Sequence, residues 1–258
     1  MFSSQAVRAL LLSGAAGLST LLGALVILFI RKRSEKLVTA SLGFAGGVML
    51  SVSFMDMLPE AIKMFDKTMD SKLGVILSVV FVIVGLLCAV ALDLLVPHTH
   101  HDGDGEREHQ NLFRVGMVSM AAIALHNLPE GVATFMAGYD NAKLGFTIAV
   151  AIAAHNIPEG ITVAMPIYFA SGDRKKAFRF AFLSGVTEPI GALLVFLLLQ
   201  PFISSFVLGV VFAIVAGIMI YISIEELIPS SRQYGHARLA LFSAFAGICL
   251  MPLTHVIG

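Results

Sequence analysis

The sequence predicts an all-α membrane protein, a polytopic bundle of eight transmembrane helices. Apolar residues make up 57% of the 258 residues and charged residues only 13%, about half the charged share of a water-soluble domain. A six-residue unit occurs twice inside apolar segments, and a longer segment near the start of the chain recurs near its end. Eight apolar segments are long enough to cross a bilayer, since a spanning helix needs about 20 residues.

The eight expected spans follow one another with short polar connections, none of them long enough for a soluble domain. We place the spans at residues 7–30, 37–62, 73–97, 112–138, 143–169, 176–200, 202–229 and 237–257. The first span is followed by Arg31, Lys32 and Arg33 without a clear small-residue cleavage site, so we interpret it as a retained helix and not as a signal peptide. Residues 1–258 are therefore expected to form a single transmembrane domain.

Basic residues indicate how the chain is oriented. Twelve of the 17 Lys and Arg residues lie in or beside the first, third, fifth and seventh connections, and five lie on the opposite side. Because cytoplasmic loops carry the excess of basic residues, both termini are expected outside the cytoplasm. Helical spans argue against an outer-membrane barrel, so a cytoplasmic (inner) membrane is expected. No basic run is dense enough to predict a nucleic-acid partner.

The two central spans carry the repeated unit. Residues 126–131 read HNLPEG, and residues 155–160 read HNIPEG, 29 positions later. This separation equals one span and a tight turn, so the copies are expected at similar depth in neighbouring antiparallel helices. On a helix wheel the Glu lies about 40° from the His and the Asn about 100° from it, so the carboxylate lies between imidazole and amide. Each Glu is thus placed to share one ion with the His and a second with the Asn.

Prolines interrupt both copies of the unit. Pro129 and Pro158 lack the N–H that would bond the carbonyls of Leu125 and Ala154, so we expect each helix to kink there. The released carbonyl oxygens would lie beside the carboxylates. Such a grouping of oxygen atoms favours a cation site.

Carboxylates lie inside the spans without an obvious partner from the chain. Glu130, Glu159 and Glu188 fall near the middle of their spans, where no Lys or Arg is expected. A carboxylate at the bilayer centre costs about 3 kcal/mol on insertion scales and needs a partner, a proton or a wet cavity. The expected partner is a cation from outside the chain.

A second repeat surrounds the first. Residues 47–59 match residues 217–229 at an offset of 170, with Asp56 opposite Glu226. Spans one to three, about 7–97, therefore look duplicated as spans six to eight, about 176–257, around a central pair at about 112–169. Three spans per repeat give the copies opposite topology. This 3+2+3 inverted-repeat arrangement is typical of secondary transporters with a midplane site.

The candidate ligands form a mixed nitrogen and oxygen set. His126, Glu130, His155 and Glu159 suit Zn²⁺, Fe²⁺, Mn²⁺ or Cd²⁺ and suit Ca²⁺ or Mg²⁺ alone poorly. The remaining candidates for a second ion supply only oxygen; they are Asn127, Asn156 and Glu188. We therefore predict divalent transition metals as the bound and transported species, with no catalytic cofactor.

Weaker candidates lie elsewhere in the chain, each with an ordinary structural alternative. Met49 is a soft ligand or a packing residue. Four acids line an entrance or exit path, or lie at the headgroup layer: Asp56, Glu60, Glu225 and Glu226. Three histidines of the third connection hold metal weakly, or belong to a solvated loop: His98, His100 and His101.

Other functions were weighed against metal transport. An intramembrane metalloprotease needs a Glu beside the first His as general base, and Asn127 or Asn156 stands there instead. An enzyme is therefore not expected. A proton-conducting or proton-coupled protein would use the same carboxylates, although the Asn residues do not titrate and favour metal ligation. Ligand chemistry alone leaves metal efflux open as well.

The paired HNxPEG units on adjacent spans, the His-rich third connection and Glu188 in the sixth span resemble the ZIP (Zrt/Irt-like) divalent metal transporters, and most closely their bacterial zinc uptake branch. The resemblance implies Zn²⁺ uptake, often with Fe²⁺, Mn²⁺ or Cd²⁺. It implies one metal site at His126, Glu130, His155 and Glu159 with Met49 as an added ligand, and a second at Asn127, Asn156, Glu188 and the two bridging Glu residues. The expected partners are metal ions and the lipid bilayer, with a homodimer left open.

Overall fold

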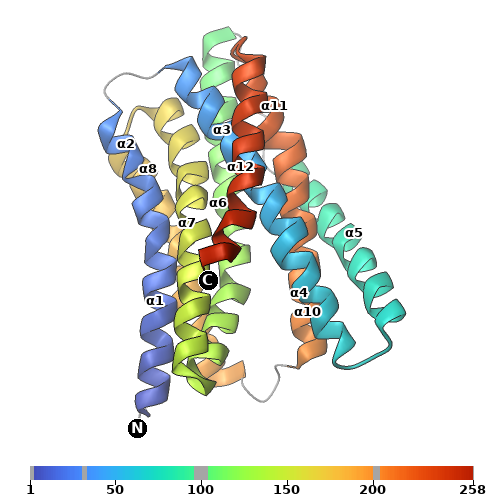
Figure 1. Ribbon diagram of the computed structural model, residues 1–258. Coiled ribbons are helices and arrows are strands. Elements are labelled where there is room, and N and C mark those ends of the chain that lie inside the picture. Colours follow the sequence, from blue (N-terminus) through green and yellow to red (C-terminus); the bar gives the residue numbers. More distant parts are fainter. Residues whose placement is uncertain (1–2, 31–33, 96–103, 200–203, 258) are drawn as a thin grey trace.

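The computed structural model describes residues 3–30, 34–95, 104–199 and 204–257, which form helices joined by short turns (Figure 1). The α-helices are α1 (Ser4–Ala24), α2 (Val26–Phe29), α3 (Glu35–Val52), α4 (Leu58–Asp66), α5 (Ser71–Leu95), α6 (Asp104–Asp140), α7 (Ala142–Ser171), α8 (Arg174–Gly185), α9 (Thr187–Leu194), α10 (Ser205–Tyr221), α11 (Ile228–Arg232) and α12 (Ala237–Ile257). Three π-helical segments join some of them: η1 (Ser53–Met57), η2 (Val195–Leu199) and η3 (Ile222–Leu227). No strand occurs among these described residues, which confirms the all-α prediction.

Seven helical segments of the described chain are long and apolar enough to cross a membrane. They are Ser4–Phe29, Glu35–Asp66, Ser71–Ala91, Leu112–Tyr139, Gly145–Ser171, Arg174–Leu197 and Ser205–Arg232. The eighth predicted span corresponds to α12, whose apolar segment Ala237–Leu250 is shorter. The observed boundaries differ from the predicted ones by a few residues, so the multi-pass membrane architecture is confirmed.

Side-chain caps and glycine turns explain where several helices begin. Ser3 accepts a hydrogen bond from the backbone of its helix at the start of α1, and Ser204 does the same at α10. Asp173 caps α8 by accepting from two backbone N–H groups. Gly172 and Gly235 have φ of 71° and 73°, a backbone conformation that favours glycine, just before α8 and α12.

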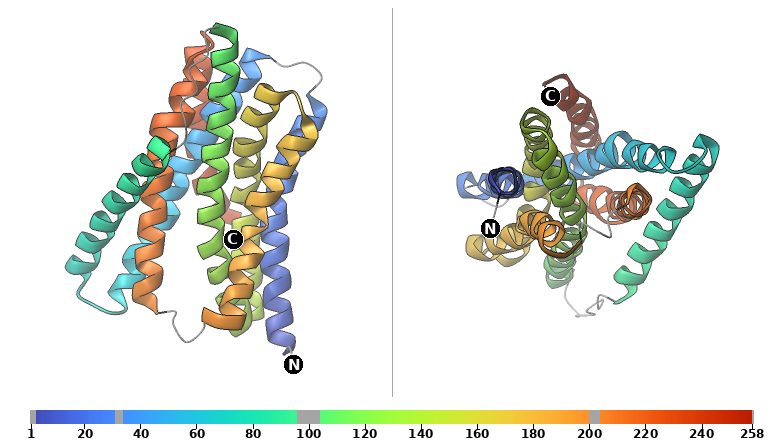
Figure 2. Two further views of the ribbon diagram at one scale, coloured as in Figure 1. Left: turned by 180° about the vertical axis from the view of Figure 1, so that it is seen from behind. Right: turned by 90° about the horizontal axis from the view of Figure 1, so that it is seen from below.

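The helices are arranged around the antiparallel pair α6 and α7, which pack along each other. The helix α1 packs against α7, as α9 packs against α6. The helix α3 contacts α7 and is covered by α12, as α10 contacts α6 and is covered by α5. An approximate two-fold relation therefore runs between α6 and α7. The helix α5 lies at the outer edge of the bundle and splays away from it at its α4 end (Figures 1 and 2).

The long sequence repeat has a structural counterpart. The π-helical segments η1 and η3 lie at equivalent positions of the two copies. In the first turn of each segment, Ser53 Oγ donates to the Met49 carbonyl at 2.7 Å and Ser223 Oγ donates to the Met219 carbonyl at 2.7 Å. The wide helical turns were not predicted from the sequence. This match supports the expected repeat, while its inverted 3+2+3 arrangement stays a prediction.

The basic ends of three helices lie together. The starts of α3, α8 and α12, which carry Lys36, Arg174 and Arg238, lie at one end of the bundle, uppermost in Figure 1. The N-terminal end of α1 lies at the opposite end. This common placement agrees with the charge pattern that predicts orientation.

The apolar core lies between the helices, and large apolar side chains also face outward. Leu42, Ile123 and Met165 are fully buried in the main core, whereas Leu87 on α5 and Phe242 on α12 are more than half exposed. An apolar exterior is what a bilayer requires, since lipid tails and not water surround it.

Candidate metal centre

Two carboxylates converge on one imidazole between α6 and α7. His126 and Glu130 lie on α6 and Glu159 lies on α7, and all three side chains are buried. His126 Nε2 lies 3.0 Å from Glu130 Oε1 and 3.3 Å from Glu159 Oε1. Two ligands bound at 2.0–2.1 Å to one tetrahedral Zn²⁺ are separated by about 3.3 Å. The imidazole nitrogen is thus separated from each carboxylate oxygen by about the distance expected between two ligands of one ion.

The two Asn amides are held in the same way in the two helices. Asn127 Nδ2 donates to the Ser184 carbonyl at 3.1 Å, and Asn156 Nδ2 donates to the Ala16 carbonyl at 3.0 Å. Both side chains are fully buried. Their Oδ1 atoms have no hydrogen-bond partner in the part of the chain that the structure describes. Because the nitrogen atoms are anchored, the oxygen atoms are the ones available to a cation.

Glu188 joins this group from a third span. The helix breaks at Val186 between α8 and α9, and Glu188 lies in the first turn of α9, fully buried. Its Oε2 accepts a hydrogen bond from Asn156 Nδ2 at 2.8 Å, while its Oε1 has no hydrogen-bond partner among the described residues. A buried carboxylate with one unused oxygen has a strong need for a cation. The structure therefore brings Glu188 to the α7 copy of the motif.

The last residue of each motif allows the close approach of a neighbouring helix. A Cβ atom on Gly131 would overlap the carbonyl of Glu188 on α9. A Cβ atom on Gly160 would overlap the carbonyl of Thr20 on α1. The contacts are reciprocal, because Gly191 and Gly23 approach the backbone of the motifs in turn. The glycines thus fix the depth at which α9 and α1 meet the candidate ligands.

Several predicted residues are not placed at this centre. The His155 side chain and the third-connection residues His98, His100 and His101 lie outside the part of the chain that the structure describes. Met49 is fully buried on α3 in the main apolar core. Within the described side chains, no group of three or more His, Cys, Asp and Glu residues is arranged so that it could hold a metal ion. The roles of His155 and Met49 as ligands stay predictions.

One of the predicted path residues has a partner that the sequence did not reveal. Glu226 in η3 is buried, and its Oε1 lies 2.9 Å from Arg114 Nη1 on α6. By its place in the sequence Arg114 was predicted to lie in or beside the third connection, and no basic partner was expected for the acids of the spans; this expectation is wrong for Glu226, because α6 begins ten residues before Arg114. Glu60 pairs with Lys63 at 3.2 Å in a more exposed position.

The remaining path acids are partly or fully accessible. Asp56 in η1 is half-buried, and Glu225 in η3 is exposed. Their accessibility is compatible with a lining of the two approaches and equally with positions at the membrane surface. Both alternatives expected from the sequence therefore stay open.

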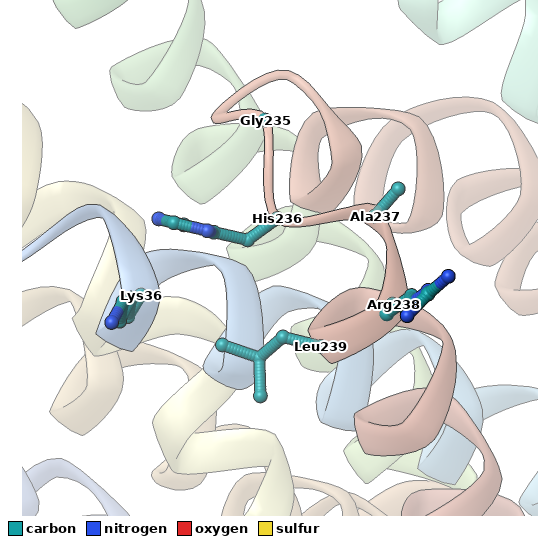
Figure 3. A pocket seen from close by; sticks show the side chains of 6 residues that line it. All are labelled: Lys36, Gly235, His236, Ala237, Arg238 and Leu239. Atoms are coloured by element: carbon teal, nitrogen blue, oxygen red, sulfur yellow. The ribbon is translucent and has the colours of Figure 1, made fainter.

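A cavity of about 600 Å³ lies at the starts of α3 and α12 (Figure 3). None of the candidate ligands that the structure describes lines it. Its lining includes the basic side chains Lys36, His236 and Arg238, together with Gly235, Ala237 and Leu239. No carboxylate is among the described residues that line it. Such a lining repels divalent cations, so the candidate metal centre is the group between α6 and α7.

Comparison with known proteins places the chain among zinc transporters. The profile of the ZIP zinc transporter family matches residues 6–115 and 97–254. A zinc transporter ZupT of Chlorobium luteolum is 44% identical over 255 residues, covering 95% of this chain and 96% of the relative. The proteins of the same name from Streptococcus mutans and Clostridium perfringens are 41% and 37% identical, and each alignment covers at least 96% of both chains.

Proposed function

The chain belongs to the ZIP zinc transporter family, and on that premise we propose that it carries divalent transition-metal ions, zinc first among them, into the cytoplasm. The observation that supports this most strongly is the convergence of Glu130 and Glu159 on His126 in a fully buried setting between α6 and α7. A site that binds its metal permanently would have a structural role, whereas a transport site must release the ion. Here mixed nitrogen and oxygen ligands hold an ion less tightly than thiolates, which suits release.

The two Glu residues are proposed to bridge two ions. His126, Glu130, Glu159 and His155 would bind the first ion, with Met49 as an added ligand. The second ion would be held by oxygen atoms of the same two Glu residues together with Asn127, Asn156 and Glu188. The anchored amides and the unused oxygen atoms of Asn127, Asn156 and Glu188 support this assignment.

Metal entry exchanges charges inside the membrane. Without a cation, the buried carboxylates cost free energy unless protons or the imidazole compensate them. A divalent ion replaces that compensation and releases protons, because ligands bind metal in their deprotonated form. The same ligand set accepts Zn²⁺, Fe²⁺, Mn²⁺ and Cd²⁺, since all are borderline cations. The chemistry is binding and release, and no catalytic step is required.

We place the protein in the bacterial cytoplasmic membrane with both termini outside the cytoplasm. The basic starts of α3, α8 and α12 would then face the cytoplasm. Asp56 and Glu60 would line the outer approach, whereas Glu225 and Glu226 would line the inner one. Lipid surrounds the apolar exterior, and a homodimer stays an open alternative.

Transport further requires access to alternate between the two sides. We propose that spans one to three and six to eight form inverted repeats that move around the α6 and α7 pair. The equivalent π-helical segments η1 and η3 support equivalent roles for these two parts. The Arg114–Glu226 ion pair joins α6 to η3 on the side proposed to be cytoplasmic, and it would close that side in this conformation.

Zinc entry into liposomes tests the function. Purified protein is reconstituted with a trapped zinc-sensitive dye, and wild type is compared with Glu159→Gln at several pH values. Saturable entry that falls more than tenfold in the variant is expected, because the amide removes a bridging negative charge. Glu35→Gln is the matched control, since Glu35 at the start of α3 is an exposed acid outside the proposed path. Proton flux without metal, or unchanged entry in Glu159→Gln, would contradict the proposal.

A further inference from the structure

Thr20 occupies in α1 the position that Glu188 occupies in α9. Its carbonyl meets Gly160 of the α7 motif, as the Glu188 carbonyl meets Gly131 of the α6 motif. The two residues are 168 positions apart, and so are Ala16 and Ser184, whose carbonyls anchor the two Asn amides. The approximate two-fold relation therefore pairs Thr20 with Glu188.

This pairing predicts where the Thr20 side chain faces. Glu188 lies on α9, which packs on α6, and its carboxylate reaches across to Asn156 of α7. The Thr20 side chain of α1 lies against Gly185 of α8, where an added Cβ would be 3.2 Å from Thr20 Oγ1, and Gly185 follows Ser184, whose carbonyl anchors the amide of Asn127. Asn127 Oδ1 has no hydrogen-bond partner among the described residues. A polar group on this side of the centre is thus unmatched.

The Thr20 hydroxyl itself is also unmatched. Thr20 is fully buried, and its Oγ1 has no hydrogen-bond partner in the described part of the chain. A helical Thr ordinarily donates to the carbonyl one turn back, which here is that of Ala16. That carbonyl already accepts from Ser19 Oγ at 2.6 Å and from Asn156 Nδ2 at 3.0 Å. The hydroxyl therefore remains for another acceptor or donor.

We propose that the Thr20 hydroxyl is a further part of the ion-binding centre, on the Asn127 side, where it holds a water molecule bound to the transported divalent cation. This rests on the proposed function. A Thr side chain is two bonds shorter than a Glu side chain, so its oxygen stops short of the place that the Glu188 carboxylate reaches on the other side. One water molecule fills such a gap, and it satisfies two buried polar groups that otherwise have no partner.

The hydroxyl also sets the charge of the centre. A carboxylate at position 20 would complete the two-fold relation and raise the number of buried acids in the candidate centre, now Glu130, Glu159 and Glu188, from three to four. A neutral hydroxyl keeps the α1 side weakly binding and the α9 side strongly binding. Weaker binding on the α1 side lowers the affinity of the centre for the ion, and a transported ion must be bound with moderate affinity so that it can be released.

A purely structural role for Thr20 makes a different prediction. If the side chain only allows α1 to approach α7, then its shape matters and its hydroxyl does not. Thr20→Val keeps the shape and removes the hydroxyl, whereas Thr20→Ser keeps the hydroxyl and removes a methyl group. The two variants therefore separate the two roles.

The experiment measures Zn²⁺ in two ways, as binding to purified protein in detergent and as entry into liposomes. We expect Thr20→Val to weaken zinc binding and raise KM about tenfold with the maximal rate less affected, and Thr20→Ser to stay within about twofold of wild type. Thr39→Val is the matched control, because Thr39 on α3 is also fully buried with no hydroxyl partner among the described residues. Thermal unfolding of each variant confirms that it is folded.

Two results would overturn the inference. Thr20→Val that binds zinc like wild type removes the hydroxyl from the centre, and Thr20→Ser that fails like Thr20→Val shows that packing alone matters. Wild type that binds zinc but carries none across the membrane overturns the proposed function instead, while the binding measurement still decides the role of Thr20. Wild type that binds no zinc overturns both.

Discussion

The α6 half and the α7 half of the molecule share one frame and differ in their charges. Each motif glycine meets a backbone carbonyl of a flanking span, and each Asn amide donates to a carbonyl four residues earlier in that same span, on α1 for the α7 motif and on α8, before the break to α9, for the α6 motif. These backbone contacts are shared, but the position that Glu188 occupies on α9 is occupied by the uncharged Thr20 on α1. The scaffold is thus repeated more faithfully than the ionisable groups.

The difference extends to the flanks of the centre. Arg114 on α6 is buried against Glu226, whereas Lys143, 29 residues later at the equivalent position of α7, is exposed. Backbone contacts do not depend on charge, so they can be shared by two halves of opposite orientation. Ion pairs depend on which side is closed. The shared backbone contacts therefore position the candidate ligands in both halves, and the unequal charges make the two halves differ.

The largest effect is expected when a methyl group is added at a motif glycine, because it disrupts the backbone contacts that both halves share. Gly131→Ala and Gly160→Ala each place a Cβ atom into a backbone carbonyl, which cannot turn away as a side chain does. We expect both variants to lose folded protein or all zinc entry, and to do so equally. Gly14→Ala is the control, because its Cβ would meet nothing within 4 Å. Size-exclusion profiles and thermal unfolding measure the effect; a strong loss in only one variant would contradict a shared frame.

The charge difference is tested next at the buried ion pair. Arg114→Gln leaves Glu226 buried without its cation, with side chains that are only 13% and 6% exposed in the wild-type pair. Removing one partner of a buried pair costs about 3–5 kcal/mol, so the free energy of unfolding should fall by about that amount. Lys143→Gln at the equivalent exposed position should leave it unchanged. Chemical denaturation in detergent measures both variants.

A double variant separates charge from shape at this pair. If the cost arises from an unpaired carboxylate, Arg114→Gln combined with Glu226→Gln should recover most of the lost stability. A double variant as unstable as Arg114→Gln would instead mean that packing of the Arg side chain, and not its charge, stabilises the contact between α6 and η3.

Much of the fold was predictable because membrane helices have simple requirements. The length and apolarity of each segment predicted the spans to within a few residues, and the two HNxPEG units predicted that His126 and Glu159 meet between α6 and α7. That a metal ion binds there stays a prediction. Glu188 was predictable because a carboxylate followed by proline is costly in the middle of a span. These features are local, so a single sequence shows them.

What could not be predicted depends on contacts between distant segments. The Arg114–Glu226 pair joins residues 112 positions apart, and nothing near Arg114 marks it as inward-facing. The π-helical turns of η1 and η3 depend on how these helices pack, although the matching Gly, Met, Ser and Pro positions of the long repeat could have suggested equivalent geometry. Nothing in the sequence around Thr20 predicts a role in ion binding. Its equivalence to Glu188 becomes visible only when the contacts of α1 are compared with those of α9.

The smallest expected effect compares the two Asn residues directly. Asn127→Ala and Asn156→Ala remove the same anchor and the same candidate ligand, but only Asn156 also donates to the Glu188 carboxylate, at 2.8 Å. A hydrogen bond to a charged group contributes about 1.5–3 kcal/mol, so Asn156→Ala should weaken zinc binding about tenfold more than Asn127→Ala. Zinc titration of purified protein measures the ratio.

The same titration in a Glu188→Gln background shows whether the ratio arises from that contact. With the negative charge gone, the hydrogen bond from Asn156 loses most of its strength, and the two Asn variants should become nearly equal. If the tenfold ratio persists without the Glu188 charge, the α7 half binds metal more tightly for a reason other than Glu188. Equal losses in the wild-type background would show that both halves contribute alike to metal binding despite their unequal charges.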